Sequence, residues 1–174
     1  MDDEQGRPNQ STTTKTRSGT PKGLIDTFAV QCGKCFKWRK IHTREAFEEI
    51  RMRVKEEEFV CQTIEDVSCL DDAELEYDST RIWVGDKPGV AKTPTGFERK
   101  IVLRKDNSRV DVYYVTPAGK RMRTLNELAV FIDANPDFKD TRLEDFTFTA
   151  PKIMEETISG GKRKRISRPS KEHE

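Results

Sequence analysis

Two stretches in the second half of the chain alternate between apolar and polar residues with a period of two. They span residues 98–105 and 109–116, and only Asp106, Asn107 and Ser108 separate them. Such alternation predicts strands with one buried face, and a short polar break between two of them predicts a hairpin. We therefore expect an antiparallel β-hairpin here.

The two faces of this hairpin differ in character. Side chains two residues apart share a face, so one face is apolar and consists of Ile101, Leu103, Val110, Val112 and Tyr114. The opposite face carries Lys100, Val102, Arg104, Asp111 and Tyr113. The first set predicts contact with a core, and the second predicts a polar surface.

Helical spacing follows the hairpin. Residues 116–119 (TPAG) predict a turn, and Thr124 and Glu127 have the spacing of a capping box. We expect a helix directly after Thr124 that ends before Pro136, with an apolar stripe toward the sheet made by Leu128, Phe131 and Ile132. A second helix is expected over residues 44–57, where a partial apolar stripe runs among charged residues.

The composition is polar for a single globular core. Of 174 residues, 36% are charged and 33% are hydrophobic, which favours small modules joined by solvated segments. No apolar run approaches the length of a membrane span, and no signal-peptide pattern is present, so we expect neither a membrane nor a secretory role. In such a chain, cysteines are better interpreted as metal ligands than as disulfides.

Positive charge is concentrated in one segment. Residues 99–123 contain eight Lys or Arg and two acids, a local charge of +6, whereas the whole chain carries +1. This concentration is typical of proteins that bind a phosphate backbone, although a solvated sheet face is the alternative. The acids favour the first interpretation. Asp111 faces Arg104 across the hairpin and Glu127 lies one helical turn from Arg123, so each guanidinium has a carboxylate to hold it for reading guanine.

Four cysteines are confined to one small polar segment. They follow the spacing C-x2-C-x25-C-x7-C and are Cys32, Cys35, Cys61 and Cys69. Tetrahedral Zn²⁺ takes four thiolates, and a CxxC turn presents two of them together. We therefore expect a Zn²⁺ site that stabilises this module, with an incidental CxxC and two buried thiols as the alternative. His42 is expected at the surface.

The segment GFERKIVLRK, followed by VDVYYVTPAGKRMR and a helix, resembles the methyl-CpG-binding domain. The resemblance implies an α/β wedge in which two arginines, each held by an acid, contact the guanines of a CpG step beside a tyrosine near the cytosine methyl groups. By position, the implied DNA-binding residues are Arg104, Arg123, Asp111, Glu127, Tyr113, Lys105 and Thr124. Lys105 and Thr124 fall where the family contacts phosphate. Two departures are Phe97 in place of a tryptophan and a shorter hairpin loop.

The segment VQCGKCFKWR, followed later by FVC, resembles the CW-type zinc finger. That family reads methylated lysine of the histone H3 tail in an aromatic cage, where cation–π attraction holds the methylammonium group. The resemblance implies Trp38 as one wall, whereas Ala29 occupies the position of the other wall. Phe28 and Trp83 are the available replacements. Alternatively, Trp38 covers the zinc-binding turn.

Together these features predict an α+β protein with two small modules and disordered ends. The expected organisation is a disordered tail over 1–23, a CW-type zinc finger over 24–72, a linker over 73–92, a methyl-CpG-binding-like domain over 93–153 and a disordered basic tail over 154–174. Within the linker, Ile82, Trp83 and Val84 are expected to pack against one module. The KRKR cluster in the last segment predicts nuclear import.

The leading functional hypothesis is a nuclear chromatin protein that binds DNA, methylated CpG included. Its zinc module would contact the histone H3 tail or another protein of a chromatin complex. The rival hypothesis is a methylation-insensitive interaction adapter within a chromatin-modifying or transcriptional regulatory complex. An enzyme is disfavoured, because the chain offers two histidines, no nucleophile with a paired base, and four thiols expected on metal.

Overall fold

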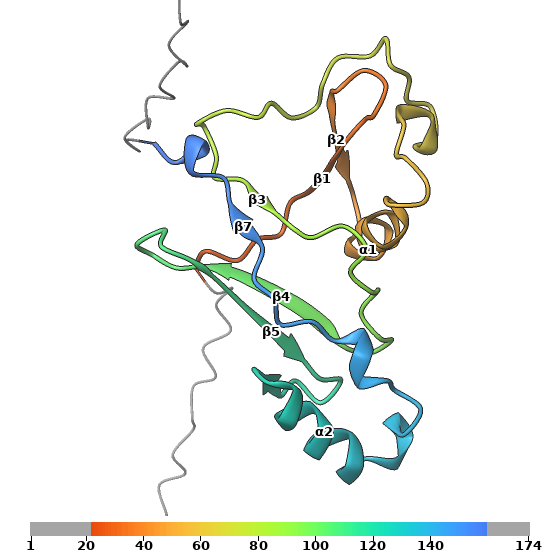
Figure 1. Cartoon of the computed structure of the whole chain (residues 1–174), viewed down its shortest axis with the longest axis vertical. Helices are drawn as coiled ribbons and strands as arrows, with labels where there is room; N and C mark the ends of the chain where they lie inside the picture. The colour runs from red at the N-terminus through yellow and green to blue at the C-terminus, as the bar shows by residue number, and fades with distance from the viewer. Residues whose placement is uncertain (1–21, 160–174) are drawn as a thin grey trace, which may run out of the picture.

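The computed structural model of the chain describes residues 22–159, which form an α+β structure of two lobes (Figure 1). One lobe contains β1, β2 and α1, the other contains β4, β5 and α2, and the β3–β7 pair lies between them. Of the tails expected over residues 1–23 and 154–174, residues 1–21 and 160–174, with the KRKR cluster, lie outside the described residues. Within residues 22–159, no helix has the length and apolar character needed to span a membrane.

The first lobe is a two-stranded sheet with one helix. Strands β1 (Phe28–Gln31) and β2 (Trp38–Ile41) pair antiparallel, and α1 (Arg44–Arg53) follows them. The helix begins at Thr43, whose side chain accepts a hydrogen bond from the Ala46 N–H at 3.2 Å. It ends earlier than expected, because three consecutive acids at residues 56–58 would extend it with negative charge at its negative end. The short helix η1 (Cys61–Thr63) completes the lobe.

The second lobe contains the expected hairpin and helix. Strands β4 (Glu98–Leu103), β5 (Val110–Val115) and β6 (Arg121–Met122) form an antiparallel sheet in the order β4-β5-β6. Helix α2 (Leu125–Ala134) packs on its apolar face, followed by η2 (Pro136–Phe138) and η3 (Leu143–Asp145). The buried core of this lobe consists of Phe97, Tyr114, Met122, Leu128, Ile132 and Phe146. The periodicity of residues 98–134 therefore predicted both elements, and of the residues expected to face a core, Tyr114, Leu128 and Ile132 lie in it.

The chain after α2 folds back over this core. Phe146 is buried in it, and the Tyr114 hydroxyl donates to the Thr147 carbonyl at 3.2 Å and accepts from the Thr147 N–H at 2.9 Å. Strand β7 (Lys152–Ile153) then pairs with β3 (Val84–Gly85), and η4 (Glu155–Thr157) follows. Residues 154–159, expected to begin a disordered tail, are therefore part of the folded structure.

The chain at the start of the first lobe also extends the sheet of the second lobe. The Ile25 N–H donates to the Ile101 carbonyl at 2.9 Å, and the Leu103 N–H donates to the Gly23 carbonyl at 2.8 Å. Gly23 adopts a φ of +85°, and a Cβ there would lie 2.3 Å from the Leu103 oxygen. A glycine at this position thus allows the chain to lie along the free edge of β4.

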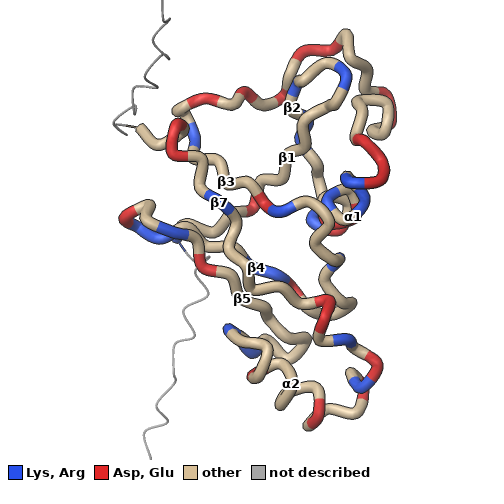
Figure 2. The backbone as a smooth tube through the Cα atoms, viewed as in Figure 1, with Lys and Arg blue, Asp and Glu red and all other residues tan. Residues whose placement is uncertain are grey.

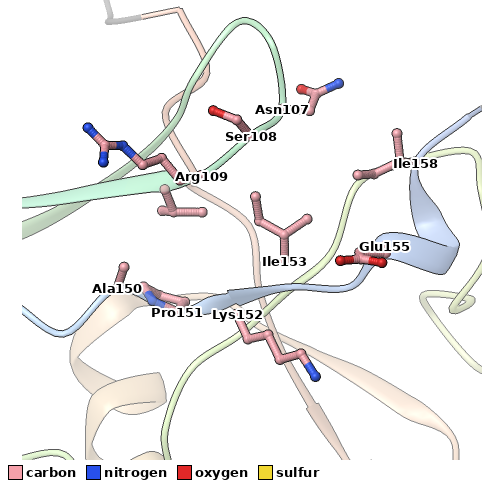
Figure 3. A pocket seen from close by; sticks show the side chains of 10 residues that line it. Asn107, Ser108, Arg109, Ala150, Pro151, Lys152, Ile153, Glu155 and Ile158 are labelled. Atoms are coloured by element: carbon pink, nitrogen blue, oxygen red, sulfur yellow. The ribbon is translucent and has the colours of Figure 1, made fainter. Parts of the chain in front are cut away.

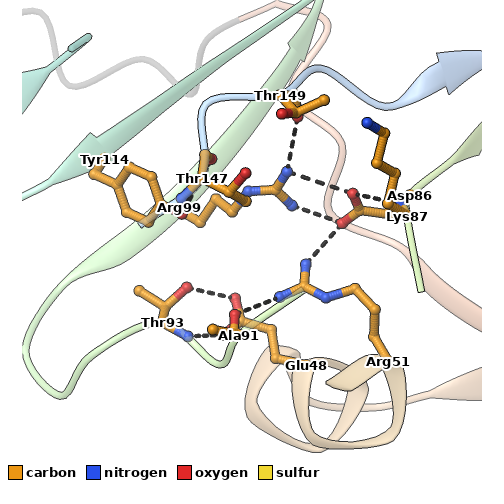
Figure 4. Close-up of polar contacts among 10 residues, drawn as sticks. All are labelled: Glu48, Arg51, Asp86, Lys87, Ala91, Thr93, Arg99, Tyr114, Thr147 and Thr149. Atoms are coloured by element: carbon orange, nitrogen blue, oxygen red, sulfur yellow. Dashed lines mark hydrogen bonds and ion pairs between the residues drawn. The ribbon is translucent and has the colours of Figure 1, made fainter. Parts of the chain in front are cut away.

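A carboxylate that is mostly shielded from solvent joins the two lobes (Figure 4). Asp86 accepts from Arg51 of α1 at 2.7 Å and from Arg99 of β4 at 2.6 Å; both arginines are buried, and the Asp86 side chain is 9% exposed. Nearby, the buried Glu48 accepts from the Thr93 N–H at 2.7 Å and from its hydroxyl at 2.9 Å. Two buried arginines thus share the carboxylate of Asp86, while the buried Glu48 is hydrogen-bonded to Thr93.

The segment expected to be a linker thus supplies several contacts between the lobes. Leu75 forms a bridge to Trp38, β3 pairs with β7, and Asp86 binds arginines of both lobes. The relative orientation of the lobes is consequently set by buried hydrogen bonds rather than by a solvated connection.

Candidate metal centre and candidate nucleic-acid interface

The four cysteines converge on one point in the first lobe. The sulfur atoms of Cys32, Cys35, Cys61 and Cys69 all lie within 4.8 Å of one another. The Sγ–Sγ distance is 3.9 Å between Cys32 and Cys69 and 3.6 Å between Cys35 and Cys61. Four thiolates at about 2.3 Å from a tetrahedral Zn²⁺ would lie about 3.8 Å apart, so the donor set and its spacing fit Zn²⁺. The expected zinc site is confirmed.

A tight turn and a short helix position these ligands. In the CxxC turn, the Phe36 N–H donates to the Cys32 carbonyl at 3.0 Å, and Phe36 adopts a φ of +60°. Cys61 begins η1, which turns its thiol back toward the CxxC sulfurs. The site is therefore assembled from two separate turns, a geometry that the spacing alone indicated.

Arg39 links the two ends of the metal site, and sequence reasoning gave it no role. Its side chain is 1% exposed, and its Nε donates to the Cys61 sulfur at 3.2 Å. Its Nη2 donates to the carbonyls of Ser68 and Asp71 at 2.9 Å each, on either side of Cys69. A buried guanidinium beside thiolates offsets their negative charge and fixes the loop that carries the last ligand. The arginine of KWR was the available signal.

Trp38 lies in a cluster of three aromatic side chains. Its ring centroid is 4.9 Å from that of Trp83 and 6.2 Å from that of Tyr77, and the Tyr77 and Trp83 centroids are 5.4 Å apart. Of the two residues considered as replacements for Ala29, Trp83 is the one beside Trp38. Phe28 instead stacks on Phe47 of α1 at 5.2 Å.

The Tyr77 hydroxyl donates to the Glu156 carboxylate at 2.6 Å. Partial desolvation of this 38% exposed residue, together with the hydrogen bond to Glu156, raises the pKa of Tyr77 to about 12. Tyr77 therefore stays a neutral donor at physiological pH and ties the aromatic cluster to η4. Sequence reasoning did not identify Tyr77, because it is isolated in an acidic stretch with no periodic pattern.

The polar face of the second lobe holds Arg104 against Asp111. Arg104 Nε lies 2.9 Å from Asp111 Oδ2, and Nη2 lies 3.1 Å from Oδ1, so the contact is bidentate. The hydrogen bond from Arg104 is the largest cause that lowers the pKa of Asp111 below its ordinary value, and the charges of Arg109 and Arg123 lower it further. The carboxylate therefore stays ionised, and it is attracted by the guanidinium groups of Arg104, Arg109 and Arg123.

Arg123 lies on the same face as Arg104. Tyr114 pairs with Met122 and Val115 with Arg121, so the next position of that register sets Arg123 beside Tyr113. The Glu127 carboxylate accepts from the main-chain N–H of Arg123 at 2.6 Å, and within residues 22–159 these two side chains form no salt bridge. Glu127 thus holds the backbone at Arg123, whereas the sequence predicted that it would hold the guanidinium.

Tyr113, expected to be an exposed contact residue, is 7% exposed. The guanidinium carbon of Arg121 lies 4.2 Å from the centroid of its ring. Arg121 belongs to β6 and shares the polar face, but sequence reasoning counted it only as one charge among eight. No periodic signal could have indicated that its side chain covers the tyrosine.

The remaining predicted contact residues flank this face. Lys105 is exposed at the start of the hairpin loop, and Thr124 caps α2 by accepting from the Glu127 N–H at 3.2 Å. Figure 2 shows Lys and Arg at the hairpin and near the start of α2, whereas acidic residues line the chain between η1 and β3. The hairpin and the start of α2 thus each carry basic residues, whereas the acidic stretch lies along the other lobe.

A cavity of about 530 Å³ separates the hairpin loop from β7 (Figure 3). Residues 107–109 of the loop line one side, and Pro151, Lys152 and Ile153 line the other. The space opens between the loop and β7. The cavity lies beside the arginine face and does not include Arg104 or Arg123.

Comparison with known proteins adds two family matches. The model of the methyl-CpG binding domain matches residues 83–156, and that of the CW-type zinc finger matches residues 28–75. No solved structure gives a significant match to the chain.

Several curated proteins of Arabidopsis thaliana are similar over most of the chain. Methyl-CpG-binding domain-containing protein 1 is 52% identical over 163 residues, covering 92% of this chain and 80% of the relative. Methyl-CpG-binding domain-containing protein 4 is 48% identical over 157 residues, covering 90% and 83% respectively. Methyl-CpG-binding domain-containing protein 2 is 34% identical over 162 residues, covering 88% and 59%. The similarity extends through both lobes and the segment between them.

Proposed function

Because this chain belongs to the family of methyl-CpG-binding domain-containing proteins, we propose that it binds DNA at CpG steps, methylated ones included. In this proposal Arg104 and Arg123 enter the major groove and each contacts a guanine. The paired guanines of a CpG step lie on opposite strands one base step apart, so two arginines on one small face are suited to them.

One observation carries the proposal. Arg104 and Arg123 share the polar face of the β4–β5–β6 sheet with the ionised carboxylate of Asp111. A guanidinium held by a carboxylate has its remaining N–H groups fixed in one plane, which favours bidentate hydrogen bonds to guanine O6 and N7. The role of Glu127 in this account is to fix the main chain at Arg123.

Contacts to the phosphate backbone would come from the edges of the same face. Lys105 is exposed at the hairpin loop, and Thr124 lies at the positive end of α2. Both positions favour phosphate oxygens, because one offers an ammonium group and the other lies beside free helix N–H groups. These contacts would position the arginines without adding sequence information.

For the zinc module, we propose contact with the basic tail of histone H3 at Trp38. Trp38, Tyr77 and Trp83 bring three aromatic rings together, and Glu156 lies against one of them. Aromatic faces beside carboxylates attract lysine side chains and methylated lysine. Since the rings lie 4.9–6.2 Å apart, the cation would rest on their outer side rather than between them.

The same close packing favours a second candidate function. If Trp83 serves only to cover Trp38, the zinc module has no peptide site, and the protein acts as an adapter that holds subunits of a chromatin complex. Binding of a histone H3 peptide, followed by tryptophan fluorescence, separates these functions. Saturable binding that is weakened by Trp38→Ala supports peptide contact, and no binding at millimolar peptide supports the adapter.

We include a nuclear location in this proposal, because the proposed binding partners of the protein are DNA and histone H3. The division into a zinc finger over 24–72, a linker over 73–92 and a DNA-binding domain over 93–153 stays a prediction. The match to the CW-type zinc finger ends at residue 75, and the match to the methyl-CpG binding domain begins at residue 83. Asp86, within the expected linker, contacts arginines of both lobes.

The DNA-binding proposal is tested by titrating the protein with a CpG duplex and a duplex lacking CpG at several salt concentrations. We expect tighter binding to the CpG duplex, and an affinity for both duplexes that falls steeply with salt, because each neutralised phosphate contributes about −0.9 to the logarithmic slope. Equal affinity for the two duplexes would refute base recognition, and an affinity independent of salt would refute backbone contact.

A further inference from the structure

Arg121 and Tyr113 form a stacked pair on the polar face of the second lobe. The guanidinium carbon lies 4.2 Å from the ring centroid, a distance at which a cation and an aromatic face attract each other. Tyr113 is 7% exposed, whereas Arg121 itself is exposed. A group that approaches this part of the face meets the guanidinium before it meets the ring.

The pair also differs from the other arginine contact on this face. Arg104 is held by a carboxylate, but within residues 22–159 Arg121 forms no salt bridge. The ring of Tyr113 is therefore the contact that orients the Arg121 side chain. Its N–H groups remain available at the surface that is proposed to meet DNA.

From this geometry we infer that Arg121 is a specificity-determining residue that makes the chain indifferent to cytosine methylation. The inference rests on the proposed function, in which the polar face enters the major groove. A cytosine C5-methyl group would gain from contact with an apolar ring, but here a hydrated cation occupies the ring face. Arg121 thus removes the surface that would distinguish a methylated cytosine from an unmethylated one.

The magnitudes of the two competing contacts are similar. Burying one methyl group against an apolar surface raises affinity about fourfold. Displacing a cation from an exposed aromatic ring lowers affinity about two- to fivefold. Because a methyl group can reach the Tyr113 ring only by displacing Arg121, the gain and the cost nearly cancel. The wild-type protein should therefore bind methylated and unmethylated CpG within about twofold of each other.

The test compares the affinities of wild type and Arg121→Ala for the same CpG duplex with and without symmetric methylation. We expect Arg121→Ala to bind both duplexes more weakly than wild type, because a cation is lost, but to prefer the methylated duplex about fourfold. Lys120→Ala is the matched control. It removes an exposed neighbouring charge, so it should weaken binding to both duplexes equally.

A second variant tests whether Tyr113 is the residue that the loss of the Arg121 side chain exposes. Combining Tyr113→Ala with Arg121→Ala removes the ring as well and should abolish the preference gained by Arg121→Ala, whereas Arg121→Lys should give a preference between wild type and Arg121→Ala, since an ammonium stacks less well than a guanidinium. Circular dichroism confirms that each variant is folded.

Three results would overturn the inference. They are a wild type that already prefers methylated DNA several-fold, an Arg121→Ala variant that binds DNA with no preference, and a double variant whose preference equals that of Arg121→Ala. Failure of the wild type to bind either duplex would overturn the proposed function and this inference with it.

Discussion

Both carboxylate oxygens of Asp111 accept hydrogen bonds from Arg104, at 2.9 and 3.1 Å. The pair joins the two strands of the hairpin across the loop, at its exposed end. Its contribution to folding is small, because exposed ion pairs contribute little to stability. The pair is better explained by what it does for Arg104, whose side chain it holds in one orientation on the face proposed to meet DNA.

We predict that Asp111→Asn lowers sequence discrimination more than it lowers overall DNA affinity. The substitution keeps the shape of the side chain but removes the charge that holds Arg104, and it adds one unit of positive charge to the face. The ratio of affinities for CpG and non-CpG duplexes should fall toward one, while non-specific binding stays equal or becomes tighter. Competition titrations measure this ratio, and an unchanged ratio would show that the contact has no role in recognition.

Zinc removal should unfold the first lobe. The buried contacts of that lobe are few, and its four cysteines converge on one site. A strong chelator should therefore reduce the helical circular dichroism of α1, and added Zn²⁺ should restore it. The core around Phe97 and Tyr114 contains no cysteine, so near-ultraviolet signals from it should persist in part. A spectrum that does not respond to the chelator would contradict four-thiolate ligation.

Asp86→Asn should destabilise the whole protein by about 3–5 kcal/mol, because it leaves two buried arginines without their shared carboxylate. Urea denaturation measures this loss. Asp133→Asn, on the exposed side of α2, is the control and should change stability by less than about 0.5 kcal/mol. A similar small effect of both substitutions would show that Asp86 does not hold the lobes together.

The same carboxylate predicts how stability depends on pH. Burial alone would raise the pKa of Asp86, but the hydrogen bond and charge of Arg99, with the charge of Arg51, lower it below its ordinary value. A carboxyl group with a lowered folded-state pKa stabilises the protein above its unfolded pKa of about 3.9, and this stabilisation is lost as the pH falls through the folded value. The free energy of unfolding should therefore drop on acidification below about pH 4, and less steeply in Asp86→Asn.

Local patterns predicted the elements of the fold well, because those elements depend on nearest neighbours in the chain. The hairpin, the helix after Thr124 and the convergence of the cysteines all follow from spacing. Three predictions failed, and only the last of them concerns contacts between distant segments. Helix α1 is shorter than residues 44–57, Glu127 holds a main-chain N–H, and residues 154–159 are folded.

The contacts that join the lobes have no local signature. Asp86, Arg51 and Arg99 are separated by many residues, and each is a charged side chain that composition would assign to the surface. The stacking of Arg121 on Tyr113 likewise depends on where β6 joins the sheet. Such contacts are decided by tertiary packing, so a reading of periodicity and charge does not reveal them.

The central claim is that two arginines on one face read the CpG step, and Arg123→Ala tests it most directly. Its affinity should be compared with that of wild type on two duplexes that differ only in the CpG step. We predict a loss of about 1–3 kcal/mol on the CpG duplex and little loss on the other, because only a base contact depends on the sequence. An equal loss on both duplexes would contradict the claim and reduce Arg123 to a backbone contact.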